Sequence, residues 1–111
     1  MILALDFGSK NCSVFSKIPE DFEFLDHASY LRVSNTKCLS IGGFQDGKPS
    51  NRVQSISFTN GEIKVAKLPD LNIGRCQPSV MFYNKVLYVS GGSSKPKNED
   101  MLKSVECLGF G

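Results

Sequence analysis

A strand-like run at the start of the chain ends in Asp6, which is followed by Phe7, Gly8 and Ser9. An aspartate at a strand end can hold a metal ion, and the backbone N–H groups of a Gly-Ser turn can cradle a phosphate. The same residues also suit a β-hairpin, because a short Gly, Ser and Asn connection between two apolar runs is a hairpin signal. The sequence therefore predicts an ordinary hairpin turn here, with a phosphate or metal site as the alternative.

The other residue types that commonly do chemistry lack suitable partners. His27 is the single histidine and has no Ser, Cys or acidic partner at a recognisable spacing, so a catalytic triad is not expected. The four cysteines contain no C-x-x-C pair, and they are Cys12, Cys38, Cys76 and Cys107. Each falls in or beside a predicted strand, where a free thiol behaves as a small hydrophobic side chain. We therefore expect buried reduced thiols rather than disulfides, no metal site and no cofactor.

Charge and hydropathy argue against several classes of partner. The 111 residues include 13 basic and 11 acidic ones, which are too dispersed to form the basic stripe that a nucleic acid requires. No apolar run approaches the roughly 20 residues that cross a bilayer, and the first residues do not have the pattern of a secretion signal. The sequence therefore predicts a cytoplasmic globular protein that binds neither nucleic acid nor membrane.

The elements that would position these residues are short strands. Apolar runs are at most eight residues long and are bounded by turn residues, and no stretch has the 3.6-residue period of a helix. Asn60-Gly61 and Asn84-Lys85 are expected to be hairpin turns between such runs. The sequence predicts about eight or nine antiparallel strands and essentially no helix. The main predicted strands are 1–7, 12–15, 26–33, 37–41, 52–58, 62–66, 78–83, 86–90 and 102–110.

A repeat with a period near 50 organises these strands. Two apolar strands end in paired glycines, Gly42-Gly43 and Gly91-Gly92, which lie 49 residues apart. Such glycines indicate backbone with φ > 0 or a close approach to other backbone. A pattern Val-x-x-aliphatic-x-Phe follows each pair and ends at Phe58 and Phe110, and a truncated copy ends at Phe7. A period of this length built from four short strands is typical of a β-propeller blade.

The order of these features resembles the kelch repeat: an apolar strand, Gly-Gly, a polar loop, a strand ending in an aromatic residue, a turn, a strand and an aliphatic-Pro step. The chain differs from that repeat in having no tryptophan, and the usual arginine before the next strand is present only as Arg75. The resemblance implies an all-β fold of antiparallel four-stranded blades in a partial propeller. It assigns 1–24 to the outer half of a preceding blade, 25–67 to a complete blade and 75–111 to three strands of the next.

The resemblance also implies a protein-binding scaffold or adaptor, such as one that recognises substrates for a ubiquitin ligase or associates with the cytoskeleton. The contacts with another protein would come from the loops 44–51 and 93–100 and from the Pro-containing connections around Asp21 and Arg75. The candidate exposed residues are Phe44, Arg52, Arg75 and Lys97. Phe7, Phe58 and Phe110 would pack between blades. Because two blades cannot close a propeller ring, we expect the remaining blades or self-association to cover the open faces.

An enzymatic alternative depends on the first turn. The stretch from Ile2 to Asn11 also resembles the first phosphate-binding strand and turn of the actin and heat-shock ATPase superfamily, and the opening strand of ribonuclease-H-like enzymes. Those folds need further acidic strands and helices between strands, and no stretch beyond residue 12 predicts a helix of ten residues. We therefore predict a binding module rather than an enzyme, and keep a fragment of such an enzyme as the alternative.

Overall fold

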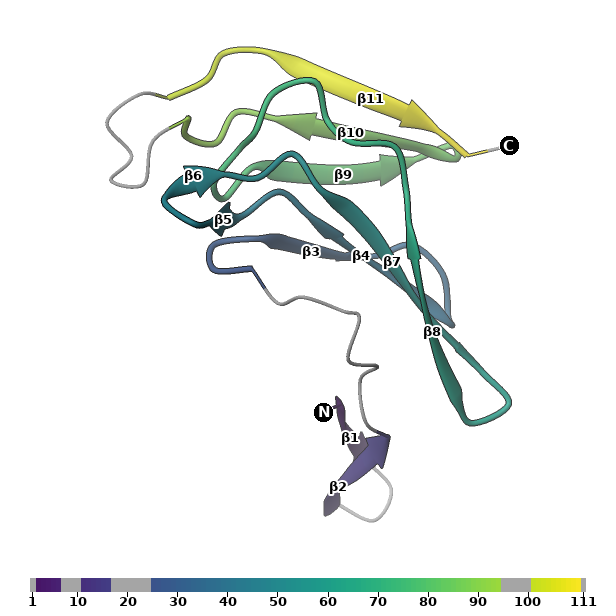
Figure 1. Ribbon diagram of the computed structural model, residues 1–111. Helices are drawn as coiled ribbons and strands as arrows, with labels where there is room; N and C mark the ends of the chain where they lie inside the picture. Colours follow the sequence, from purple (N-terminus) through teal and green to yellow (C-terminus); the bar gives the residue numbers. More distant parts are fainter. Residues whose placement is uncertain (1, 7–10, 17–24, 95–100, 111) are drawn as a thin grey trace.

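A computed structural model describes residues 2–6, 11–16, 25–94 and 101–110. Every regular element in these ranges is a β-strand, and the strand pairs are antiparallel, which confirms the predicted all-β class (Figure 1). Strands β1 (Ile2–Asp6) and β2 (Asn11–Ser16) pair with each other in a two-stranded sheet. Phe7, Gly8 and Ser9 of the predicted phosphate turn lie outside the described residues.

The first large sheet has four strands in the order β3-β4-β7-β8. Their bounds are Ser29–Arg32 for β3, Lys37–Ile41 for β4, Val53–Thr59 for β7 and Glu62–Lys67 for β8. Asn60 and Gly61 connect β7 to β8 with φ of 50° and 75°. Two successive positive φ angles are those of a type I′ turn, which the Asn-Gly pair favours. The predicted Asn-Gly hairpin is therefore confirmed.

The second large sheet has three strands in the order β11-β10-β9. Their bounds are Ser79–Tyr83 for β9, Val86–Ser90 for β10 and Val105–Gly109 for β11. The predicted two-residue turn between β9 and β10 is confirmed, because Tyr83 pairs directly with Val86. A further small hairpin, β5 (Phe44–Gln45) and β6 (Lys48–Pro49), follows β4 and precedes β7.

The hydrophobic core lies between the two large sheets. Side chains alternate between the faces of a strand, so each sheet presents every second residue to the other. The buried cluster consists of Leu39, Ile41, Val53, Leu71, Leu87 and Val89. Phe110 packs against this cluster and makes an edge-to-face contact with Phe82, with ring centroids 5.4 Å apart. Phe110 thus lies between the sheets as predicted, whereas Phe58 alternates with the core residue Val53 and is placed on the other face of its sheet.

The two glycine pairs have matching backbone environments. The N–H of Gly42 donates to the carbonyl of Arg52 at 2.9 Å, and the N–H of Gly91 donates to the carbonyl of Ser104 at 3.2 Å. Gly43 and Gly92 have φ of 114° and 78°, a region that disfavours any side chain. A Cβ atom on Gly92 would lie 2.7 Å from the carbonyl oxygen of Cys76, so glycine is required there for space as well as conformation.

No helix within the described ranges is long and apolar enough to cross a membrane.

Candidate functional site

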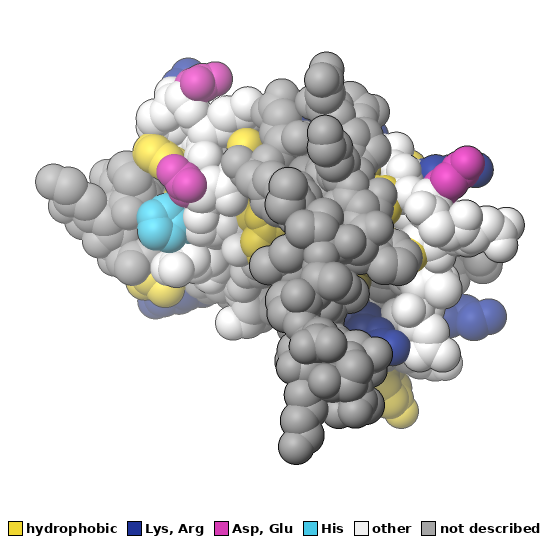
Figure 2. Space-filling view, turned by 90° about the horizontal axis from the view of Figure 1, so that it is seen from below, with side chains coloured by type: hydrophobic (Ala, Val, Ile, Leu, Met, Phe, Trp, Pro, Cys, Tyr) yellow, Lys and Arg dark blue, Asp and Glu magenta, His cyan; other side chains and the backbone are white. Residues whose placement is uncertain are grey.

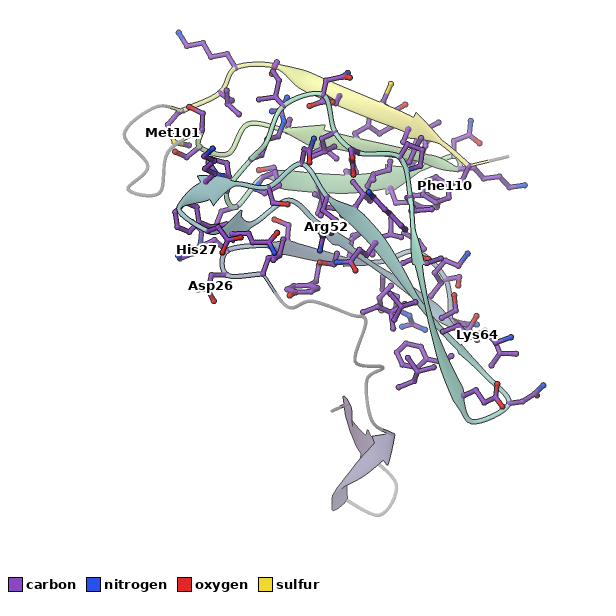
Figure 3. All side chains as sticks on the ribbon, viewed as in Figure 1. Asp26, His27, Arg52, Lys64, Met101 and Phe110 are labelled. Atoms are coloured by element: carbon purple, nitrogen blue, oxygen red, sulfur yellow. The ribbon has the colours of Figure 1, made fainter. Side chains whose placement is uncertain are left out.

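The described residues that directly follow the two glycine pairs lie at one end of the large sheets. Phe44 forms a bridge with Asp26, and Ser93 forms bridges with both Cys76 and Met101. Figure 3 shows Asp26 and Met101 at this end and Lys64 at the far end of the first sheet. The two predicted binding loops, 44–51 and 93–100, therefore begin on the same side of the fold. Asp21 and Lys97 lie in 17–24 and 95–100, outside the described residues.

The β5–β6 hairpin is the best-defined part of this end. Phe44 pairs with Pro49 and Gln45 pairs with Lys48, which leaves Asp46 and Gly47 as a two-residue turn. Their φ angles of 51° and 80° are again those of a type I′ turn, for which Asp-Gly is a preferred sequence. The base of the hairpin is anchored, because the Phe44 N–H donates to the Asp26 carbonyl at 2.7 Å. The hairpin therefore holds its side chains on a fixed support.

A polar pocket of about 350 Å³ lies beside this hairpin, and we call it the hairpin pocket. It is lined by Gln45, Lys48, Pro49, Ser50, Asn51, Arg52, Lys67 and Asp70. Three of these side chains are cationic and one is a carboxylate. Lys67 Nζ lies 3.8 Å from Asp70 Oδ2, and both side chains are largely exposed, so water and salt weaken this pair. With three cationic side chains to one carboxylate, the lining favours an anionic group in the pocket.

Phe44 and Arg52 are half-buried rather than fully exposed as predicted. Arg52 is fixed through its backbone, because its N–H donates to Ser50 Oγ at 3.1 Å and its carbonyl accepts from Gly42. The Arg52 side chain lines the hairpin pocket, whereas Phe44 stands at the base of the same hairpin. The structure therefore brings these two candidates to one region of the surface.

The prediction that Arg75 is an exposed binding residue is wrong. Its side chain has 0% exposure and reaches into the second sheet. Nη1 donates to the carbonyls of Gly91 and Ser104 at 2.9 and 3.0 Å, and Nη2 donates to Ser104 Oγ at 2.7 Å. Nε and Nη2 donate to Glu106 Oε2 at 3.2 and 3.1 Å. All five N–H donors of the guanidinium are therefore used within the fold, which explains its complete burial.

The backbone of Arg75 bonds to the other large sheet and its loop. Its N–H donates to the Ser50 carbonyl at 3.0 Å, and its carbonyl accepts from the Gly43 N–H at 2.8 Å. Arg75 therefore ties the hairpin end of the first sheet to strands β10 and β11 of the second. Its role is to position the loops rather than to contact a partner.

Glu106 completes this connection. Burial of its side chain opposes ionisation, but hydrogen bonds from the Asn72 and Ile73 N–H groups and the adjacent Arg75 outweigh that effect and lower the pKa of Glu106. Sequence reasoning did not single out this residue. The signal was its position in β11, where it shares the core-facing register with Leu108 and Phe110. A glutamate in such a register needs a cationic partner, and Arg75 is that partner.

The thiol and histidine predictions have mixed outcomes. Cys38, Cys76 and Cys107 are free thiols as predicted, but only Cys76 is buried, and Cys107 is exposed on β11. Burial raises the pKa of the Cys76 thiol, whose Sγ lies 3.6 Å from the Gly43 carbonyl oxygen. His27, the single histidine, is at the surface in Figure 2 (cyan). Among the described residues, no group of three or more His, Cys, Asp or Glu could hold a metal ion.

A scan for known protein families finds no match to this chain, and no curated protein matches it.

Proposed function

We propose that the chain is a protein-binding module built from kelch-like blades. The four strands β3, β4, β7 and β8 form one blade, and β9, β10 and β11 are three strands of the next. Support comes from hydrogen bonds that recur at the repeat spacing. The Phe44 N–H donates to the Asp26 carbonyl, and 49 residues later the Ser93 N–H donates to the Cys76 carbonyl. In each large sheet, neighbouring strands are antiparallel, as they are in a propeller blade.

The hairpin pocket and Phe44 form the proposed contact surface for a partner protein. The observation that carries this proposal is the set of three cationic side chains around a polar pocket beside an anchored hairpin. Arginine and aromatic side chains dominate the energetics of many protein interfaces, and both types are present here in Arg52 and Phe44. The surface therefore suits a protein segment that carries carboxylates next to an apolar residue.

Adaptor roles follow as part of the same proposal. A rigid sheet scaffold that presents one charged loop surface suits substrate recognition for a ubiquitin ligase or association with the cytoskeleton, in the cytoplasm. We propose no catalytic step, because the function depends on contact alone.

The test uses two synthetic peptides with one aromatic residue each, one rich in Asp and Glu and the other carrying Asn and Gln at the same positions. Fluorescence anisotropy at low salt should show binding of the acidic peptide only, and binding should weaken as salt rises. The double variant Lys48→Ala/Arg52→Ala should lower the affinity at least tenfold. Lys64→Ala is the matched control, because Lys64 is an exposed cation at the far end of the first sheet (Figure 3).

Two results would overturn the proposal. Equal binding of both peptides would show that charge in the hairpin pocket does not select the partner. An equal loss in the Lys64→Ala variant would show that the overall charge of the chain, rather than this pocket, attracts the peptide.

A further inference from the structure

Strand β11 forms an open edge of the second sheet. Among the described residues it pairs with β10 alone, and it is the outermost strand of that sheet in Figure 1 (yellow). The Phe110 N–H donates to the Lys85 carbonyl, and the Ser104 carbonyl accepts from Gly91. Because backbone groups alternate in direction along a strand, the even-numbered residues face β10. The N–H and C=O groups of Val105, Cys107 and Gly109 therefore point to the open side.

The first sheet shows what fits beside such a strand. In β7 the Phe58 N–H donates to the Thr36 carbonyl at 2.7 Å, which corresponds to the bond from Phe110 to Lys85. The groups on the other side of β7 bond to β8, as in the hydrogen bond of 2.9 Å from the Leu68 N–H to the Val53 carbonyl. A strand thus occupies the position beside β7 that remains open beside β11.

A second feature lies next to this edge. A pocket of about 210 Å³ opens between the two large sheets, and we call it the inter-sheet pocket. It is lined by Val53, Pro69, Asp70, Leu71, Asn72, Leu87, Val89, Glu106, Cys107 and Leu108. Most of these side chains are apolar, and the Glu106 carboxylate is already bonded to Arg75 and to backbone N–H groups. The pocket therefore favours an apolar side chain.

The register of the first sheet relates the edge to this pocket. Val65 of β8 lies directly opposite Ile56 of β7, and directly opposite residues share a face of the sheet. Leu108 of β11 is the counterpart of Ile56, 52 residues later, and it lines the inter-sheet pocket. A strand added beside β11 in the same register would therefore place one apolar side chain opposite Leu108 and toward the pocket.

We propose that the open edge of β11 binds an extended segment of another protein as an added antiparallel strand. The segment carries apolar residues at alternate positions, as β8 does at Ile63 and Val65, and one of them enters the inter-sheet pocket. Strand addition supplies backbone hydrogen bonds for affinity, and the pocket supplies selectivity. β11 contains neither the Lys nor the Pro that often protects an edge, and its charged residue, Glu106, is neutralised by Arg75. This site is separate from the hairpin pocket.

The first experiment uses a fluorescent synthetic peptide with the sequence of residues 61–68, which contains β8. Anisotropy with the full chain should show saturable binding. The N–H of Leu68, the residue after β8, faces β7, so the N–H groups of Lys64 and Ala66 within β8 face it too. N-methylation of the peptide at these two positions should weaken binding at least tenfold. N-methylation at the positions of Ile63 and Val65 blocks groups that face away and is the matched control, with little change expected.

The second experiment changes one residue of the peptide to test the pocket and one residue of the chain to test the strand edge. A peptide with glutamate in place of the residue equivalent to Val65 should bind at least tenfold more weakly, because its carboxylate would enter an apolar pocket beside Glu106. In the chain, Cys107→Pro removes one outward N–H without removing a bond to β10, and should also weaken peptide binding tenfold. Unchanged capture of the acidic peptide at the hairpin pocket would show that this variant is folded.

Amide exchange followed by NMR distinguishes the possible outcomes. The peptide should slow the exchange of the N–H groups of Val105, Cys107 and Gly109. The proposal is wrong if these amides are not protected, or if the Lys64/Ala66 N-methylated peptide binds as tightly as the unmodified one. It is also wrong if sedimentation shows that the chain alone dimerises and Cys107→Pro abolishes the dimer, because the occupant would then be a second copy.

Discussion

Arg75 Nη2 lies 3.1 Å from Glu106 Oε2, and the two side chains have 0% and 12% exposure. Arg75 precedes the second sheet in the chain, whereas Glu106 lies within its last strand. Since the backbone of Arg75 bonds to Gly43 and Ser50, this ion pair connects the hairpin end of the first sheet to β11. Removing either partner would leave the other charge buried without its counter-charge, which is expensive.

Arg75→Ala should therefore lower the free energy of unfolding by about 3–5 kcal/mol. Arg75→Lys should also destabilise the chain, because one ammonium group cannot reach the four acceptors that the guanidinium contacts. Urea denaturation gives both values. Arg32→Ala is the matched control, since Arg32 is exposed and bonds only to its own turn, and a change below about 0.5 kcal/mol is expected there. Equal effects at the two arginines would contradict the structural role of Arg75.

The same pair predicts how stability depends on pH. The folded state lowers the pKa of Glu106, so the unfolded state binds a proton more readily. The stabilisation is fully present above the ordinary glutamate pKa of about 4.3 and is lost as pH falls through the lower folded value. Thermal melts between about pH 6 and pH 3 should show this loss as a fall in Tm. In the Glu106→Gln variant, Tm should fall less steeply over the same pH range. Glu62→Gln, at the exposed start of β8, is the matched charge control.

Two glycines with positive φ in different surroundings separate conformational strain from lack of space. Gly47 has φ of 80°, and a Cβ atom added there would have nothing within 4 Å, whereas a Cβ atom on Gly92 would meet the Cys76 carbonyl oxygen at 2.7 Å. Gly47→Ala should cost about 1 kcal/mol through strain alone. Gly92→Ala should cost at least about 1 kcal/mol more, because backbone must also move. Equal costs in urea denaturation would show that the close approach at Gly92 is unimportant.

Most of the strand framework could be predicted from local signals. Asn60-Gly61 and Asn84-Lys85 fix two hairpins through positive φ, so strand pairing follows from turn chemistry that the sequence displays directly. The β5–β6 hairpin could not be recognised in the same way. Its strands are two residues long, too short for alternation to appear, although Asp46-Gly47 was the turn signal.

The candidate site was harder to predict because burial of a polar residue depends on contacts distant in sequence. Arg75 lies in a Gly-containing loop, where an arginine is expected to be exposed. The acceptors of its side-chain hydrogen bonds lie 16 to 31 residues away in the sequence. Phe44 and Arg52 were predicted as exposed loop residues, whereas the structure places Phe44 in β5 and leaves both side chains half-buried. Lys67 and Asp70 join Arg52 in the hairpin pocket only through the pairing of β7 with β8.

The enzymatic alternative gives a further prediction. Asp6 is the last residue of β1 and pairs with Asn11 of β2. If the chain is a binding module, it should show neither nucleotide hydrolysis nor nuclease activity with Mg²⁺, and Asp6→Asn should leave peptide binding at the hairpin pocket unchanged. The ATPase or ribonuclease-H-like alternative would instead be favoured by a Mg²⁺-dependent activity that Asp6→Asn abolishes. Lys48→Ala/Arg52→Ala would leave that activity unchanged.

Two phenylalanines should separate binding from stability. Phe44 is half-buried at the base of the β5–β6 hairpin, and its backbone anchor to Asp26 does not depend on the side chain. Phe44→Ala should therefore weaken capture of the acidic, aromatic peptide several-fold while lowering the Tm by only a few degrees.

Phe110 packs in the core against Phe82, so Phe110→Ala should cost about 2–4 kcal/mol, within or just below the range for fully buried aromatic residues. At a temperature where the Phe110→Ala variant remains folded, its peptide affinity should equal that of the parent chain. If Phe44→Ala leaves affinity intact while Phe110→Ala reduces it, the binding surface lies nearer the far end of the sheets, and the hairpin is not the contact site.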